Sequence, residues 1–220
     1  MKVVISGYGK MGHMVEEVLR ERGIECAGAS EDIVNFDDSI AKDSVCIDFT
    51  IPDAFRANYP ALARKFKAVV VGTTGWNDIF PQVKECFEKE GTPMIYASNF
   101  SIGVNVTFAL AELASKKLAG LGYEPSIVEV HHIHKLDAPS GTAATMAAIV
   151  GEQMGVEVPI RSVREGEVPG IHELTLKGSC DKIEIRHEAF SRKGFAQGAV
   201  QAAVMTEGLS GVHEFKELIF

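Results

Sequence analysis

The sequence has little of what marks a secreted, membrane-spanning or nucleic-acid-binding protein. Its four cysteines lie far apart and form no Cys-x-x-Cys pair, which argues against a disulfide framework or a cysteine metal clamp. No apolar run approaches the ~20 residues of a membrane-spanning helix, and the run after Met1 is too short for a signal peptide. A net charge of -8 gives no overall field for nucleic acid or anionic membranes. We therefore expect a cytoplasmic protein without a nucleic-acid or membrane partner.

The first hundred residues alternate between strand-like and helix-like segments. The expected strands cover residues 2–6, 24–29, 45–49, 69–71 and 93–97, and the expected helices cover residues 11–22, 54–65 and 79–90. This alternation predicts an α/β fold with a Rossmann-like, doubly wound parallel sheet.

The pattern changes near residue 100. Helices are expected over residues 104–118 and 141–154, and strands over residues 126–134, 159–164, 172–177 and 182–189. Strands this close together indicate a mixed or antiparallel sheet with helices on one face, which is an α+β domain. We expect a first domain over residues 1–100 and a second over residues 101–194. The helix within residues 195–220 is expected to pack back on the first domain.

A glycine motif, Gly7-Tyr8-Gly9-Lys10-Met11-Gly12, follows the first expected strand and opens a helix. An acidic residue, Glu31, stands about 20 positions further on, and Asp32 could take its place. In dinucleotide sites such glycines let the backbone approach the pyrophosphate, and the carboxylate binds the ribose hydroxyls. We therefore expect NADH to be preferred, and NADPH to be accepted because Lys10 can reach its extra phosphate.

Two further segments end strands at the edge of the sheet where ligands of open α/β folds bind. Gly72-Thr73-Thr74-Gly75 follows the fourth strand, and Ala97-Ser98-Asn99-Phe100 follows the fifth. Gly72, Thr73, Thr74 and the four residues 97–100 are candidate cofactor contacts. The alternatives are a plain turn for the first segment, and a helix-capping Asx-turn or a hinge for the second.

The most informative stretch runs from His131 to Ala143 and reads His-His-Ile-His-Lys-Leu-Asp-Ala-Pro-Ser-Gly-Thr-Ala. The Ala-Pro step is expected to break the strand, and Ser140 to cap a helix that begins at Gly141. Imidazoles, an ammonium and the positive end of a helix then converge, which favours a site for a small anion. His132 and His134 could form a metal pair, but no third ligand has suitable spacing. We therefore expect no metal site.

Taken in order, these motifs resemble those of the dihydrodipicolinate reductase family. The resemblance continues through Ile47-Asp48-Phe49-Thr50, residues 99–105, Ser191-Arg192 and residues 195–200, so it spans nearly the whole chain. One departure is the short stretch between Glu31 and Val45, which leaves little room for a helix.

The resemblance implies reduction of 4-hydroxy-tetrahydrodipicolinate with NADH or NADPH and loss of water, in lysine and diaminopimelate biosynthesis. His131 would be the proton donor and Lys135 its partner. His132, Lys135, Gly141 and Thr142 would hold the carboxylates of the cyclic substrate. The second domain would bind substrate and join the chains into a homotetramer.

Two other functions stay open at this point. Another two-domain nicotinamide-dependent amino-acid dehydrogenase would share the glycine motif but not the His131–Ala143 segment. A non-catalytic dinucleotide sensor would use that segment for structure or for a partner.

Overall fold

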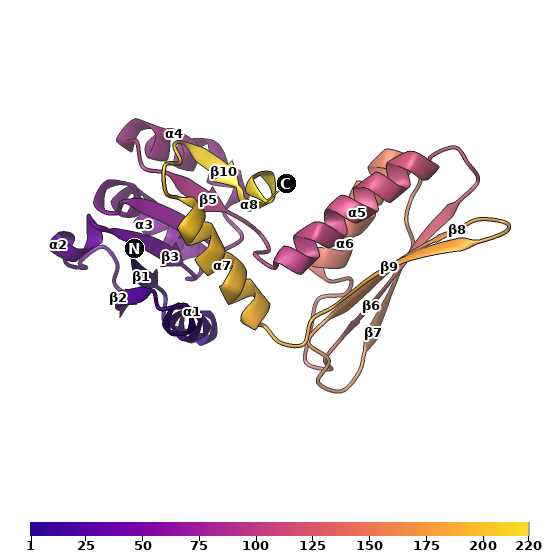
Figure 1. Ribbon diagram of the computed structural model, residues 1–220, viewed down its shortest axis with the longest axis horizontal. Coiled ribbons are helices and arrows are strands. Elements are labelled where there is room, and N and C mark those ends of the chain that lie inside the picture. The colour runs from indigo at the N-terminus through magenta and orange to yellow at the C-terminus, as the bar shows by residue number, and fades with distance from the viewer. Residues whose placement is uncertain (220) are drawn as a thin grey trace. The chain divides into compact units, whose positions relative to one another are not determined.

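The computed structural model describes residues 1–219. The chain forms two compact units (Figure 1). The first unit contains Met1–Ser101 together with the chain from Lys193 onward, and the second contains Ile102–Arg192.

The first unit is a six-stranded sheet in the order β10-β5-β4-β3-β1-β2, in which every pair is parallel. Its strands are β1 (Lys2–Ser6), β2 (Glu25–Ser30), β3 (Ser44–Asp48), β4 (Ala68–Val71), β5 (Met94–Tyr96) and β10 (Val212–Glu214). Its helices are α1 (Lys10–Glu21), α2 (Asp38–Ala41), α3 (Pro52–Lys65), α4 (Phe80–Glu90), α7 (Lys193–Met205) and α8 (Phe215–Leu218), with a 3-10 turn at Asn77–Ile79. The predicted Rossmann-like fold is confirmed.

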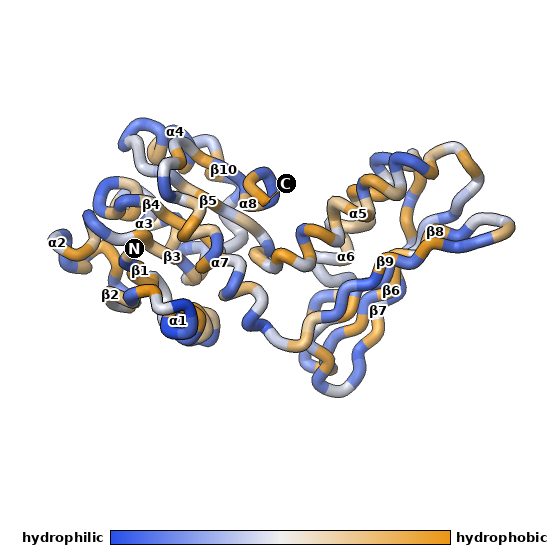
Figure 2. The backbone as a smooth tube through the Cα atoms, in the orientation of Figure 1, coloured by the Kyte–Doolittle hydropathy of each residue, from blue (hydrophilic) through white to orange (hydrophobic). Residues whose placement is uncertain are grey.

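Both faces of this sheet are buried under helices, which explains the continuous apolar runs in β1 and β4. On one face Val3 and Ile5 pack with α1 and with Ala199 of α7. On the other face Val4 packs with α3 and α4, for example through Phe55. The same division is visible in Figure 2, where the strands carry hydrophobic stretches and α1 shows a hydrophilic side.

The second unit is a four-stranded mixed sheet in the order β7-β6-β8-β9. Its strands are β6 (Glu124–His131), β7 (Ile160–Arg164), β8 (Ile171–Lys177) and β9 (Lys182–Glu188). β7 runs parallel to β6, whereas β8 runs antiparallel to both β6 and β9. The helices α5 (Ile102–Leu118) and α6 (Gly141–Met154) pack against each other and lie along this sheet in Figure 1. This arrangement confirms the predicted mixed sheet.

The buried side of β6 changes character along the strand. Ile127 lies in the apolar core with Met146 of α6 and Leu174 of β8. Glu129 and His131, two and four positions further on, are also buried. Because alternate residues of a strand share a face, this one face is apolar at one end and ionisable at the other.

One sequence expectation about β6 is wrong. The strand ends at His131, not at His134, and so it stops well before the Ala-Pro step. The His132 backbone N–H donates to Val168 O at 2.8 Å, and Lys135 N then donates to His132 O at 3.1 Å, which closes a turn. The strand therefore ends before this turn, and Lys135 lies in the turn and not on the strand.

No helix among residues 1–219 is long and apolar enough to cross a membrane.

Candidate active site

The glycine loop after β1 fits a dinucleotide. A Cβ at Gly7 would lie 2.5 Å from the Phe49 carbonyl oxygen, and Gly7 has a φ of +84°, so glycine is required there. A Cβ at Gly12 would lie 2.4 Å from the Gly7 oxygen, which means that α1 approaches the loop closely. Gly9 has open space beside it and caps α1 without a side-chain hydrogen bond. The free N–H groups of this helix end are therefore available to a phosphate.

Glu31 and Asp32 differ in what they touch. The Tyr8 backbone N–H donates to Glu31 Oε1 at 2.5 Å, which holds this carboxylate against the glycine loop. Asp32 instead accepts from Asn35 Nδ2 at 2.8 Å within its own turn. Glu31 is thus the carboxylate beside the loop at the end of β2.

The side chain of Thr73 is hydrogen-bonded to a buried carboxylate within the fold. Its hydroxyl donates to Asp48 Oδ1 at 2.6 Å, and Ser6 Oγ donates to Asp48 Oδ2 at 2.6 Å. Asp48 is fully buried, and burial raises its pKa although these hydrogen bonds oppose the shift. This cluster ties β1, β3 and β4 together at their carboxyl ends.

Residues that follow β4 and β5 line a hollow at the same edge of the sheet. Thr73, Thr74, Ala97 and Ser98 border a cavity of about 280 Å³, which Tyr96 and Glu214 also line. Gly72 is packed against Phe49, because a Cβ there would lie 2.1 Å from the Phe49 ring. These residues lie where a cofactor of this fold binds.

Asn99 and Phe100 are not among the residues that line that hollow. Asn99 Oδ1 accepts from Ser101 N at 2.8 Å, which is the Asx-turn weighed as an alternative. Phe100 is buried, and its ring packs on Phe215 and Phe49. The Phe100 ring is therefore not available to a ligand, which limits its expected role.

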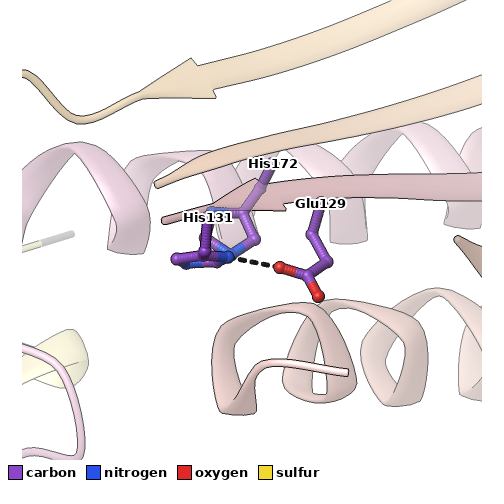
Figure 3. A group of neighbouring side chains, drawn as sticks. All are labelled: Glu129, His131 and His172. Atoms are coloured by element: carbon purple, nitrogen blue, oxygen red, sulfur yellow. Dashed lines mark hydrogen bonds and ion pairs between the residues drawn. The ribbon is translucent and has the colours of Figure 1, made fainter. Parts of the chain in front are cut away.

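The ionisable end of β6 centres on His131 and Glu129 (Figure 3). His131 Nδ1 is hydrogen-bonded to Glu129 Oε2, and Arg164 Nη1 of β7 donates to Glu129 Oε1 at 2.9 Å. Burial lowers the pKa of His131, the Glu129 carboxylate works in the opposite direction, and the charges of Lys135 and Arg164 lower it further. For Glu129, hydrogen bonds from Ser162, Arg164 and His131 outweigh its burial and hold its pKa below the ordinary value.

A second histidine, His172 of β8, stands opposite Glu129 in the sheet register. Its ring lies edge-on to that of His131 with centroids 5.1 Å apart, and Figure 3 shows the two rings together. Burial lowers the pKa of His172 to about 4, so it is neutral near pH 7. Ser140 Oγ accepts from Ala143 N at 3.2 Å and lies 3.1 Å from His172 Nε2, so the hydroxyl hydrogen is free to donate to that ring. The predicted helix cap thus also contacts the site.

The expected substrate residues occupy the turn and helix start that follow. Lys135 Nζ pairs with Asp137 Oδ1 at 2.7 Å, and its charge acts on His131. α6 begins at Gly141 directly after the Ser140 cap, and Gly141 has open space beside it. The buried Nδ1 atom of His132 has no hydrogen-bond partner among residues 1–219. An ammonium, helix N–H groups and this ring nitrogen provide the polar groups that a carboxylate requires.

The donor atoms of Glu129, His131 and His172 all lie within 4.8 Å of one another. A metal would have to replace existing hydrogen bonds, because Arg164 and His131 occupy both Glu129 oxygens and Ser140 lies against His172 Nε2. The group is therefore better described as a hydrogen-bonded network. Among residues 1–219, no third ligand group accompanies the pair His132 and His134, and His134 faces Glu167 at the surface.

Sequence reasoning missed Glu129, Arg164 and His172. Glu129 could have been found, because it lies two positions before His131 and must share its face of β6. Arg164 and His172 come from β7 and β8, and only the strand register brings them to the site.

Two family models match this chain. The model described as "Dihydrodipicolinate reductase, N-terminus" matches residues 1–100, and "Dihydrodipicolinate reductase, C-terminus" matches residues 103–219. The chain belongs to the dihydrodipicolinate reductase family. As a member of this family it is an NAD(P)H-dependent oxidoreductase, so the amino-acid dehydrogenase and the sensor are set aside.

Curated relatives of this reductase family match most or all of the chain. The chain is 40% identical to the 4-hydroxy-tetrahydrodipicolinate reductase of Christiangramia forsetii, covering 100% of this chain and 98% of that protein. It is 34% identical to the protein of the same name from Ralstonia pickettii, covering 100% and 99%. A relative of that name from Methanopyrus kandleri is 38% identical over 83% of this chain and 74% of its own length.

Solved structures agree on the fold of the reductase family. A dipicolinate-bound dihydrodipicolinate reductase from Paenisporosarcina superposes with a TM-score of 0.82 at 22% identity, covering 100% of this chain and 99% of that one. An amine dehydrogenase from Mycobacterium smegmatis gives a TM-score of 0.64 at 9% identity, covering 98% and 95%. At these identities the likeness concerns the architecture alone.

Proposed function

We propose that this chain reduces 4-hydroxy-tetrahydrodipicolinate to tetrahydrodipicolinate with loss of water, and that His131 donates the proton. The observation that carries this assignment is the place of His131 beside Lys135 and the start of α6, with Nδ1 held by Glu129. The substrate is the one in the names of the curated relatives.

The first unit would hold NADH or NADPH, which supplies a hydride when bound. The loop Gly7, Tyr8, Gly9, Lys10, Met11 and Gly12 would hold the pyrophosphate at the start of α1. Glu31 would accept the ribose hydroxyls, since it already accepts an N–H bond beside the loop. Thr73, Thr74, Ala97 and Ser98 would border the rest of the cofactor, with Gly72, Asn99 and Phe100 shaping those turns.

The second unit would bind the cyclic dicarboxylate. The first N–H groups of α6, at Gly141 and Thr142, suit one carboxylate, because a helix N-terminus favours negative charge. Lys135 and His132 would hold the other carboxylate, and Lys135 would also stabilise negative charge that develops during reduction. The chain's net charge of -8 makes such local cations necessary.

His131 has one ring nitrogen free for chemistry. Because Nδ1 is bound to Glu129, only Nε2 can give a proton to a ring carbon of the substrate. A Cβ at Gly170 would lie 3.1 Å from Nε2, so a glycine at this position leaves that edge of the ring uncovered.

The test follows absorbance at 340 nm with freshly generated substrate. His131→Gln should lower kcat by about 10²–10⁴, the usual share of a general acid, and leave the substrate KM nearly unchanged. His134→Gln is the matched control, because His134 is exposed and pairs with Glu167. A His131→Gln enzyme that keeps more than half of the wild-type activity would contradict the assignment.

We also propose a cytoplasmic homotetramer. Support for the location comes from Cys26, Cys46, Cys86 and Cys180, which are all free thiols. Support for assembly comes from β9, an edge strand that leaves Ile183 40% exposed. Light scattering at working concentration should report four chains, and a monomer would contradict this proposal.

A further inference from the structure

Glu129 is a fully buried carboxylate to which the proposed reaction assigns no role. Taking a charge out of water is costly, and a buried ion pair seldom repays that cost in stability. Both of its oxygens are occupied, one by Arg164 and the other by His131. Its place in the sheet therefore requires an explanation.

The hydrogen bond between Glu129 and His131 does not connect separate secondary-structure elements. Glu129 and His131 are two residues apart on the same strand, so the hydrogen bond between them joins no separate elements. The bond from Arg164 does join β7 to β6, and it also leaves the carboxylate fixed in place. What the Glu129–His131 contact can change is the orientation, tautomer and charge of the imidazole.

We propose that Glu129 is the positioning residue of the proton donor, which fixes the His131 ring with Nδ1–H toward the carboxylate and Nε2 toward the substrate. This inference rests on the proposed role of His131. The imidazolium gives its Nε2 proton to the substrate, and the neutral ring keeps its Nδ1 proton on the bond to Glu129. Glu129 stays ionised throughout, and His131 regains its proton from solvent. The logic is that of a carboxylate that orients a catalytic histidine.

The surrounding charges show why this carboxylate is needed. The cations Lys135, after β6, and Arg164, of β7, both disfavour a charged His131. His172 of β8 also faces it but is neutral, and His187 of β9 stands behind His172 in the register. Burial lowers the pKa of His131 as well, so among these groups Glu129 alone favours the protonated ring. Without it the donor would lose its proton at a lower pH.

The first test is the titration of His131 by 15N nuclear magnetic resonance, which needs no turnover. Neutral wild-type His131 should carry its proton on Nδ1. Glu129→Gln keeps the shape of the side chain but removes its charge, and should lower the His131 pKa by about one to three units, the usual effect of an adjacent opposite charge. Glu173→Gln is the control, because Glu173 on β8 pairs with Arg186 and does not touch His131. It should leave the titration unchanged.

The second test is the pH profile of turnover. A general acid loses activity as pH rises through its pKa, so the alkaline limb of kcat should move down by the same one to three units in Glu129→Gln. The substrate KM should stay within about twofold of wild type, because carboxylate binding is assigned elsewhere. Glu129→Asp, which keeps the charge, should restore part of the shift.

Each result decides between the possibilities. An Nε2–H tautomer in the wild type, or an unshifted His131 titration in Glu129→Gln, would overturn the positioning role. A uniform loss of activity without a moved limb would indicate a structural role and would overturn it too. If Glu129→Gln does not fold, the wild-type tautomer and the Glu129→Asp profile decide. If His131→Gln stays active, the proposed proton-donor function fails. A shifted His131 titration in Glu129→Gln would still show, separately, that Glu129 controls the His131 ring.

Discussion

Gly198 offers a sharp test of how the C-terminal part of the chain supports the cofactor site. This glycine lies buried in the middle of α7, and a Cβ there would come within 1.7 Å of the Phe100 carbonyl oxygen. Cβ atoms are essentially never closer than 3.0 Å to another heavy atom, so Gly198→Ala must separate α7 from the segment at Phe100 by more than 1 Å. Neither side is a flexible side chain that could move aside.

Two opposing effects set the magnitude. Replacing a glycine inside a helix by alanine normally stabilises by about 1 kcal/mol. Overpacking a core costs roughly 1–3 kcal/mol, and more when the obstacle is backbone. We therefore expect a net loss of up to about 2 kcal/mol, which corresponds to a Tm lower by up to roughly 8 °C. Weaker NADH binding should accompany it, because Ser98 and Asn99 precede Phe100 directly.

Thermal unfolding followed by circular dichroism, together with an NADH fluorescence titration, measures both effects. Gly194→Ala is the matched control on the same helix, since nothing lies within 4 Å of a Cβ there. It should be neutral or stabilising by up to about 1 kcal/mol and should leave NADH binding unchanged. The reasoning would be refuted if the Gly198→Ala and Gly194→Ala proteins melted at the same temperature.

Three further predictions concern charge. Lys135→Ala should lower kcat and raise the substrate KM together, with roughly 1.5–3 kcal/mol lost from the charged hydrogen bond alone. Steady-state kinetics that show a change in KM only would remove its role in stabilising developing charge. The double variant Glu31→Ala/Asp32→Ala should move the ratio of kcat/KM values from NADH toward NADPH, whereas Lys10→Ala should weaken NADPH more than NADH. An unchanged ratio in the double variant would mean that the ribose is recognised elsewhere. Finally, the pKa of His172 is about 4 in the folded protein against 6.5 for a free histidine, so the unfolded chain binds the extra proton. Stability should fall by up to about 3 kcal/mol as pH drops from 6.5 to 4, and urea midpoints for His172→Gln should lose this dependence.

The Rossmann-like part of the fold could be predicted because local signals agree with one another there. The β-branched run of β1, the glycine loop and the amphipathic α1 each indicate the same strand–turn–helix unit. β10 was not predicted, since Val212–Glu214 is only three residues long and has no hydrophobic pattern. Its pairing with β5 depends on contacts between segments more than a hundred residues apart, which no local pattern records.

The candidate site was predictable in part for the same reason. The Ser140 cap and the start of α6 are local features, and the structure has both. The end of β6 was predicted wrongly at His134 and lies at His131. It depends on a hydrogen bond from His132 to Val168, not on the Ala-Pro step. The partners of Glu129 could not be predicted from the sequence for a related reason, since β7 and β8 reach it only through the sheet register.

The division of the first unit between two distant segments has a consequence for how the protein is made. On the ribosome, all of Ile102–Arg192 is synthesised before α7 and β10, so the first unit cannot be completed until these later segments have emerged. Until then the edge of β5 stays open, and the faces of Val3 and Ile5 lack Ala199 and Ala203 of α7. Exposed strand edges and uncovered apolar faces promote aggregation of nascent chains. This chain is therefore prone to aggregate in the interval before α7 and β10 pack onto the first unit.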